Sequence, residues 1–193
     1  ILPKDELFEN FFEEHFILNK PKDVVGGDFY WFKSFGDIAI IATVDCTGHG
    51  VPGGFMSMMG SLLLDNIVKK DSLDTALILK KLNAEIIRVL NQQIGGEIQD
   101  GMDLAVCIID KKHQKIHFSG ARNGIIIISN NIVKLHDADI IPVGGSYSKK
   151  SKIMNREYKN NIISYKKDDW VFMFTDGRSE EHTSELQSRR KLV

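Results

Sequence analysis

The chain opens with a stretch in which apolar residues recur at helical spacing. Residues 3–16, PKDELFENFFEEHF, carry acidic side chains on one face and apolar ones on the other: Leu7, Phe8, Phe11, Phe12 and Phe16. This period predicts an amphipathic helix over residues 4–16. Residues 28–45, DFYWFKSFGDIAIIATVD, are instead rich in aromatic and β-branched residues and are broken by Gly36-Asp37. That pattern predicts a hairpin of two strands.

The middle of the chain has helical character. Residues 54–70 are apolar nearly all round and long enough for one helix. Residues 75–93 predict a second helix of about 20 residues, and the preceding segment 71–74, DSLD, offers an N-cap with an acid behind it.

Short strands dominate from Leu104 onward. They alternate with turns rich in Asn, Asp, Gly and Lys and are predicted at 104–110, 115–121, 125–129, 132–135, 157–165 and 170–176. The order is therefore strands, two helices and then many strands, whereas a Rossmann unit would alternate strand and helix. This order predicts an α+β fold with antiparallel sheets.

Length and charge narrow the function classes. The 193 residues suit one domain, and a formal net charge of -1 provides no field that would attract nucleic acid or an anionic membrane. The longest apolar runs are too short to span a bilayer, so we expect no direct membrane contact. Two cysteines in unrelated contexts predict a reducing, cytoplasmic setting. Because the chain starts at Ile1 without methionine, we expect it to be a piece of a longer protein.

The loop at residues 44–54, VDCTGHGVPGG, matches the glycine fingerprint of dinucleotide-binding folds. Its context argues against that function. The next predicted element after the following helix is another helix, where a second parallel strand is required. Asp45 would also place a negative charge beside the pyrophosphate, with no lysine or arginine in the loop to offset it.

Cys46 could in principle attack a phosphoester directly. Cysteine phosphatases need a nearby arginine that holds the phosphate oxygens, and residues 47–56 contain none. The sequence therefore favours Cys46 as a small side chain packed at a strand end. For His49, a role as general acid and a simply solvated side chain both stay open.

Four aspartates fall at predicted strand ends. Asp28 follows two glycines, Asp45 ends the hairpin, and the other two lie at later strand ends, Asp103 and Asp176. Carboxylates gathered in this way need a positive group between them. Hard divalent cations such as Mg²⁺ or Mn²⁺ prefer carboxylate, carbonyl and water oxygens. For Asp103 alone, a residue that merely starts a turn is an equally good interpretation.

Several motifs in this order resemble a known family. They are GGDFYWF, TVDCTGHGVPGGFMSMMG, DGMDLAVCIID, IPVGG and MFTDG. Together they resemble the metal-dependent Ser/Thr protein phosphatases (PPM), in the bacterial SpoIIE-type branch, from about Lys20 to Gly177. The resemblance implies an antiparallel β-sandwich flanked by α-helices, with two Mn²⁺ or Mg²⁺ ions at one end.

The resemblance also implies roles for individual residues. Asp45 matches the carboxylate that bridges both ions, and the backbone carbonyl of Cys46 matches a further metal ligand. Asp176 matches another ligand, and Asp28 matches the acid that orients the attacking water and contributes to the metal site. Asp103 and His49 are candidates for a third metal or for the substrate pocket.

Members of this branch hydrolyse phosphoserine or phosphothreonine by means of a metal-activated water. Their substrates are phosphorylated regulatory proteins such as anti-sigma-factor antagonists, and a sensor or signalling segment usually precedes them. The resemblance thus implies a cytoplasmic phosphatase domain, even where the full-length protein is membrane-anchored. The alternative is a catalytically inactive phosphatase-like module that binds a phosphoprotein or metal.

Two features depart from the family pattern. The segment SGARNG replaces the usual turn, so Arg122 and Asn123 receive no role. We also expect a division into an N-terminal linker and helix at 1–19, an incomplete phosphatase domain at 20–177 and a non-native tail at 178–193. The tail, RSEEHTSELQSRRKLV, resembles a translated sequencing adapter, and the family's last metal-binding Asp would be missing. That loss would impair activity.

Overall fold

The computed structural model describes residues 2–21, 26–70, 73–92, 99–145 and 156–176. Its main element is a large antiparallel sheet with strand order β1-β2-β3-β4-β8, in which β7 also pairs with β3. The bounds are β1 Phe29–Phe35, β2 Ile38–Cys46, β3 Gly101–Asp110, β4 Lys115–Ala121, β7 Val143–Gly144 and β8 Asn161–Ser164. A smaller sheet has the order β6-β5-β9, with β5 Ile125–Ser129, β6 Ile132–His136 and β9 Trp170–Met173.

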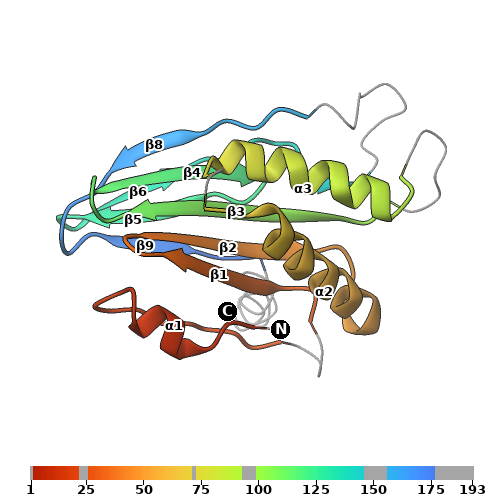
Figure 1. Cartoon of the computed structure of the whole chain (residues 1–193), viewed down its shortest axis with the longest axis horizontal. Coiled ribbons are helices and arrows are strands. Elements are labelled where there is room, and N and C mark those ends of the chain that lie inside the picture. The colour runs from red at the N-terminus through yellow and green to blue at the C-terminus, as the bar shows by residue number, and fades with distance from the viewer. Residues whose placement is uncertain (1, 22–25, 71–72, 93–98, 146–155, 177–193) are drawn as a thin grey trace, which may run out of the picture.

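Side-chain alternation gives the large sheet two apolar faces. On β2, Ile40, Ala42 and Val44 face a core formed with helices α2 (Gly50–Ile67) and α3 (Thr75–Val89). Ala39 faces the opposite core, where Ile125 and Ile127 of the small sheet pack. The helices therefore cover one face and the small sheet covers the other (Figure 1). The predicted α+β fold with antiparallel sheets is confirmed.

The helix boundaries differ from the predicted ones. Asp74 caps α3 by accepting a hydrogen bond from the Leu77 amide at 3.0 Å, but this helix ends at Val89. Helix α2 begins at Gly50, inside the glycine loop. The first turn of a helix has no intrahelical acceptors for its amides, so Pro52 is tolerated there.

The N-terminal arm (residues 2–18) is helical only over α1, Asp5–Glu9, so the predicted helix over residues 4–16 is wrong. Aromatic packing explains the difference. The Phe8 ring lies 4.4 Å from that of Phe32 on β1, and Phe16 packs at 5.8 Å on Phe172 of β9. Contacts with two separate strands override the local helical pattern. Within the described parts of the chain, no helix has the length and apolar character needed to cross a membrane.

The arm provides a matched test of this packing. Phe11 is buried and Phe16 is 64% exposed. Phe11→Ala should lower the free energy of unfolding by about 3 kcal/mol, because it leaves a cavity between the arm and the large sheet. Phe16→Ala should cost less than about 1 kcal/mol. Urea denaturation of both variants measures this difference, and equal costs would contradict the arm's placement.

Candidate functional site

Asp45 and Asp103 lie directly opposite each other at one end of the large sheet. They are register partners of β2 and β3, and partners in an antiparallel pair project from the same face. Their neighbours Val44 and Leu104 are buried in the core under the helices. Alternation therefore turns both aspartates toward the side of the small sheet.

Asp28 and Asp176 join them from the segments that precede β1 and follow β9. Asp28 immediately precedes Phe29, which pairs with Val44. The Thr175 hydroxyl donates to Asp28 Oδ2 at 2.5 Å, and Asp45 shares side-chain hydrogen bonds with both Asp28 and Asp176. We expected Asp176 to end a strand, but β9 ends at Met173 and the chain continues irregularly to the aspartate.

This four-aspartate cluster, Asp28, Asp45, Asp103 and Asp176, has perturbed electrostatics. Burial, the hydrogen bond to Asp176 and the negative charge of Asp28 raise the pKa of Asp45 to about 8. Burial also raises the pKa of Asp103, against the opposing effect of the Arg122 guanidinium, while the charge of Asp176 raises it further. The predicted acids are thus brought close enough to influence one another's protonation.

The donor set fits a hard divalent cation. Within the described residues, no three His, Cys, Asp or Glu side chains already stand in an arrangement that would hold a metal ion. Asp45 instead forms hydrogen bonds with its neighbours, which is how crowded carboxylates avoid repulsion when a proton is the positive charge at hand. A divalent cation would replace that proton, and Asp28, Asp45 and Asp176 offer it the oxygen ligands that Mg²⁺ and Mn²⁺ prefer.

Glycines let the loops that carry Asp28 and Asp45 pack closely together. A Cβ atom on Gly27 would lie 2.6 Å from the Gly48 carbonyl oxygen and 2.9 Å from that of Cys46. The buried Ser57 hydroxyl on α2 lies 2.8 Å from the Gly27 carbonyl oxygen and 2.9 Å from that of Gly53. The glycine loop therefore serves close backbone packing beside the acids.

The side chains of Cys46 and Asp45 lie on opposite faces of the large sheet. The Cys46 side chain points into the core under the helices, on the face opposite to Asp45, and burial raises the pKa of its thiol to about 12. Such a thiol is not a nucleophile at neutral pH. His49 is exposed at the N-cap of α2, where its side chain makes no capping hydrogen bond.

A cleft of about 270 Å³ opens beside Asp45 and Asp103. Its lining also includes Thr47 and Arg122, together with residues at the start of β3 and around β7: Gly101, Pro142, Gly144 and Gly145. The Thr47 hydroxyl accepts from the Gly101 amide at 3.0 Å, which fixes the loop that follows Asp45.

A buried arginine builds the far wall of this cleft. The Arg156 guanidinium donates to the carbonyl oxygens of Pro142, Gly144 and Gly145 at 2.5, 2.6 and 3.0 Å. Asn83 of α3 accepts from the Gly144 amide at 3.0 Å. Hydrogen bonds from buried side chains therefore hold this wall on its inner side, and its outer side lines the cleft.

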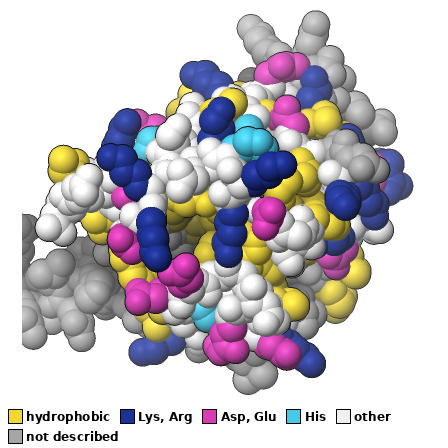
Figure 2. Space-filling view, turned by 60° about the vertical axis from the view of Figure 1, so that its left-hand side comes forward, with side chains coloured by type: hydrophobic (Ala, Val, Ile, Leu, Met, Phe, Trp, Pro, Cys, Tyr) yellow, Lys and Arg dark blue, Asp and Glu magenta, His cyan; other side chains and the backbone are white. Residues whose placement is uncertain are grey.

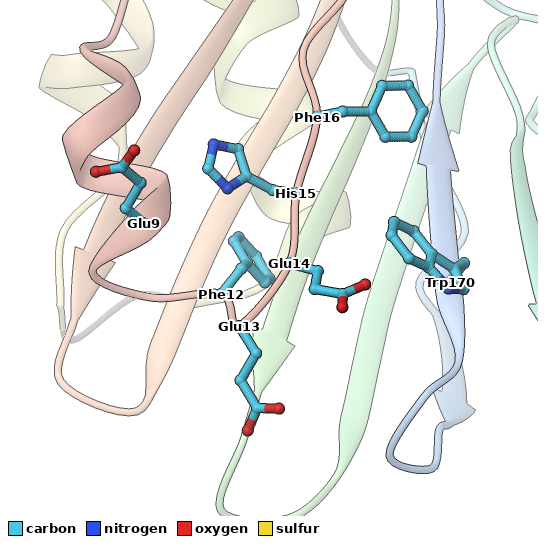
Figure 3. Close-up of a pocket in the computed structure, with 7 residues that line it drawn as sticks. All are labelled: Glu9, Phe12, Glu13, Glu14, His15, Phe16 and Trp170. Atoms are coloured by element: carbon cyan, nitrogen blue, oxygen red, sulfur yellow. The ribbon is translucent and has the colours of Figure 1, made fainter.

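A larger hollow of about 480 Å³ lies between the N-terminal arm and β9 (Figure 3). Its lining contains three glutamates and a histidine together with the aromatic residues Phe12, Phe16 and Trp170, and it includes none of the clustered aspartates. Figure 2 shows the end of the molecule that faces left in Figure 1, where acidic and basic side chains are intermixed around an apolar recess. The acid cluster, rather than the larger hollow, carries the carboxylates that could hold a divalent cation.

A family model described as stage II sporulation protein E (SpoIIE) matches residues 36–192. The chain belongs to the SpoIIE family. The resemblance predicted from the sequence is thereby confirmed. The match includes residues 177–192, which lie outside the described residues. The non-native tail and the missing final aspartate therefore stay predictions.

Solved structures agree with this family assignment. The SiaA-PP2C domain of Pseudomonas aeruginosa is 29% identical, with a TM-score of 0.78, and the similarity covers 91% of this chain and 66% of that one. The phosphatase domain of SpoIIE from Bacillus subtilis, with a regulatory fragment, is 23% identical, with a TM-score of 0.63 over 80% of this chain and 42% of that one. RsbX in complex with magnesium is 19% identical, with a TM-score of 0.62 and coverage of 83% and 71%.

The chain therefore has the fold of PP2C-type phosphatase domains, and it spans 66% of the SiaA-PP2C chain. No curated protein matches it.

Sequence reasoning missed three residues that build this SpoIIE-type site. Thr175 precedes the predicted Asp176 and was not considered, although its hydroxyl holds Asp28. Ser57 sits in an apolar helix with no pattern that marks it. Arg122 received no role because its segment departs from the family pattern, yet it lines the cleft.

The pKa of Asp45 generates a test on the metal-free chain. The folded-state pKa, about 8, exceeds the ordinary value of 3.8, so between these values the folded state binds a proton that the unfolded state has lost. Stability should therefore fall as pH rises through this window. Asp45→Asn removes this titrating group. Its free energy of unfolding should therefore rise relative to that of the parent by roughly 1–2 kcal/mol between pH 5 and pH 8. The value is small because the half-buried carboxylate is partly screened by solvent.

Chemical denaturation in EDTA at several pH values measures this difference. A difference that stays constant with pH would contradict the acid cluster.

Proposed function

We propose that this chain is a metal-dependent phosphoserine and phosphothreonine protein phosphatase domain. The observation that carries the proposal is the meeting of Asp28, Asp45, Asp103 and Asp176 beside an open cleft, within a SpoIIE-family fold. A phosphoester site needs positive charge near the transferred group, and these acids can recruit it as divalent cations.

The metal site would be built from the acid cluster. Asp45 would hold two Mn²⁺ or Mg²⁺ ions, with Asp176, Asp28 and the Cys46 carbonyl as further ligands. When bound, the ions would activate a water and balance charge on the phosphoryl oxygens. The magnesium in the RsbX complex supports a divalent cation in this fold. Because the pKa of Asp45 is raised to about 8, this residue has to lose its proton when the cations bind.

Each surrounding residue would have a definite task. Asp28, held by the Thr175 hydroxyl, would orient the attacking water. Thr47 and Gly101 fix the loop on one side of the cleft. Arg156 fixes the other wall through carbonyl oxygens in and beside β7, those of Pro142, Gly144 and Gly145. The Cys46 thiol takes no part, because it lies on the opposite face of the sheet and its pKa is raised to about 12.

The resemblance supports a phosphorylated regulatory protein of the anti-sigma-factor antagonist type as substrate. It likewise supports an upstream sensor or signalling segment in the full-length protein and action in the cytoplasm. The similarity to the SiaA-PP2C domain, at 29% identity, supports the same class of activity.

The decisive experiment measures Mn²⁺-dependent hydrolysis of p-nitrophenyl phosphate and of a phosphoserine peptide. The parent in this experiment carries a family-like C-terminal segment in place of residues 178–193, because the missing final aspartate is expected to impair the chain as it stands. Asp45→Asn should lower the rate by at least roughly 100-fold, because the positive charge at the phosphoryl group is lost. EDTA should abolish activity in the parent. Cys46→Ser keeps the backbone carbonyl and should retain activity within about twofold, since this residue's side chain faces the helix core.

Circular dichroism checks that both variants fold. Tight Mn²⁺ and phosphopeptide binding without turnover by the parent with the replaced C-terminal segment would favour the inactive binding module. Loss of activity in folded, metal-loaded Cys46→Ser would instead revive thiol chemistry.

A further inference from the structure

The cleft beside the acid cluster has one basic side chain among its described lining residues, Arg122. The other ionisable side chains that line it are those of Asp45 and Asp103. A phosphate monoester carries up to two negative charges and would meet this acidic floor as it enters. A guanidinium at the same cleft is the side chain best shaped to hold two phosphate oxygens at once.

The backbone at Arg122 is held in an unfavourable conformation. Its φ angle is +66°, in the left-handed region where glycine and asparagine are common and a long side chain is not. The Arg122 amide donates to the Asp139 carbonyl oxygen at 2.7 Å, and the Asn123 side chain donates to the Asp103 carbonyl oxygen at 3.3 Å. These contacts fix the turn, so an arginine persists where a glycine would relieve strain. Strain of this kind is concentrated at functional positions.

The ion pair between Arg122 and Asp103 is long. Its Nη1 atom lies 3.2 Å from Asp103 Oδ2 and 3.5 Å from Oδ1, longer than the 2.7–2.9 Å typical of strong charge-assisted hydrogen bonds. The Arg122 side chain is 43% exposed. An ion pair of this length with a partly exposed guanidinium contributes little to stability, and Asp103 can be exchanged for a stronger anion.

We propose that Arg122 binds the phosphoryl group of the substrate and the inorganic phosphate product, exchanging the Asp103 carboxylate for phosphate oxygens. This inference rests on the proposed phosphatase function and assigns a residue of this chain to the phosphate monoester dianion. Asp103 would then hold the guanidinium over the cleft until a phosphate arrives. The consequence is that Arg122 sets affinity for phosphate, while the aspartates hold the cations.

Calorimetric titration of the Mn²⁺-loaded 193-residue chain with inorganic phosphate tests the proposal without relying on turnover. Arg122→Asn suits the left-handed backbone, so its melting temperature should equal or exceed that of the parent. Its phosphate affinity should nevertheless fall roughly 10- to 100-fold, the worth of lost charge-assisted hydrogen bonds. Arg122→Lys keeps the charge without the two-pronged geometry and should give an intermediate loss.

Arg88→Asn is the matched control. Arg88 is exposed on α3 and pairs with Glu85 at 2.7 Å, away from the cleft lining. The phosphate affinity of Arg88→Asn should match that of the parent. If Arg122 only neutralises Asp103, Arg122→Asn should bind phosphate as the parent does, which overturns this inference and leaves the proposed function standing. A parent that binds neither Mn²⁺ nor phosphate overturns both.

Discussion

Carboxylates that share one end of a sheet repel one another, and only a proton or a cation can balance that repulsion. In this chain the balance falls on Asp45, whose pKa is raised to about 8 by burial and by hydrogen bonds and charge from Asp176 and Asp28. A fold that keeps these carboxylates together needs stabilising free energy from other contacts, which offsets their repulsion and burial. It comes from the two apolar faces of the large sheet, where Ile40 and Val44 pack under the helices and Ala105 and Cys107 pack toward the small sheet.

Because the apolar cores stabilise the fold and the carboxylates oppose it, the acids lie where the strands end. Along β2 and β3 the side chains alternate between two buried cores. The core under the helices extends to Cys46 and Met102, whereas the core on the side of the small sheet ends before Asp45 and Asp103 are reached. At this edge the chain can leave the sheet in close-packed loops. Gly27 approaches the carbonyls of Gly48 and Cys46, and Ser57 of α2 donates to the Gly27 carbonyl. The glycines that resemble a dinucleotide fingerprint therefore position carboxylates rather than a pyrophosphate.

An anionic ligand that enters the cleft is repelled by the same carboxylates. An anionic substrate approaches a floor of aspartates, so binding requires cations at the floor and a positive group at the rim. Arg122 lies at that cleft, in a backbone conformation that its side chain does not favour. Arg156 serves the opposite kind of purpose, because its buried guanidinium is directed inward to the carbonyls of Gly144 and Gly145. Arg156 thus holds the wall of the cleft in place, and Arg122 lines the cleft where we propose that phosphate binds.

The sequence by itself determined the α+β fold class, the hairpin, the N-cap of α3 and the SpoIIE-type motifs. These follow from local periodicity, turn residues and ordered motifs, which act over a few residues. It also supplied all the aspartates of the cluster, because each lies beside a glycine or a strand end that can be read directly.

Only the tertiary structure decided how these pieces meet. Contacts between distant segments set Asp45 opposite Asp103 and bring the Thr175 hydroxyl to Asp28. They also end the helix of the arm at Glu9. Local pattern carries no information about such pairings, since the free energy that selects them comes from burying side chains of one element against another. Arg122 is the clearest case, because its place at the cleft depends on Asp103 and Asp139, residues that no local motif connects to it.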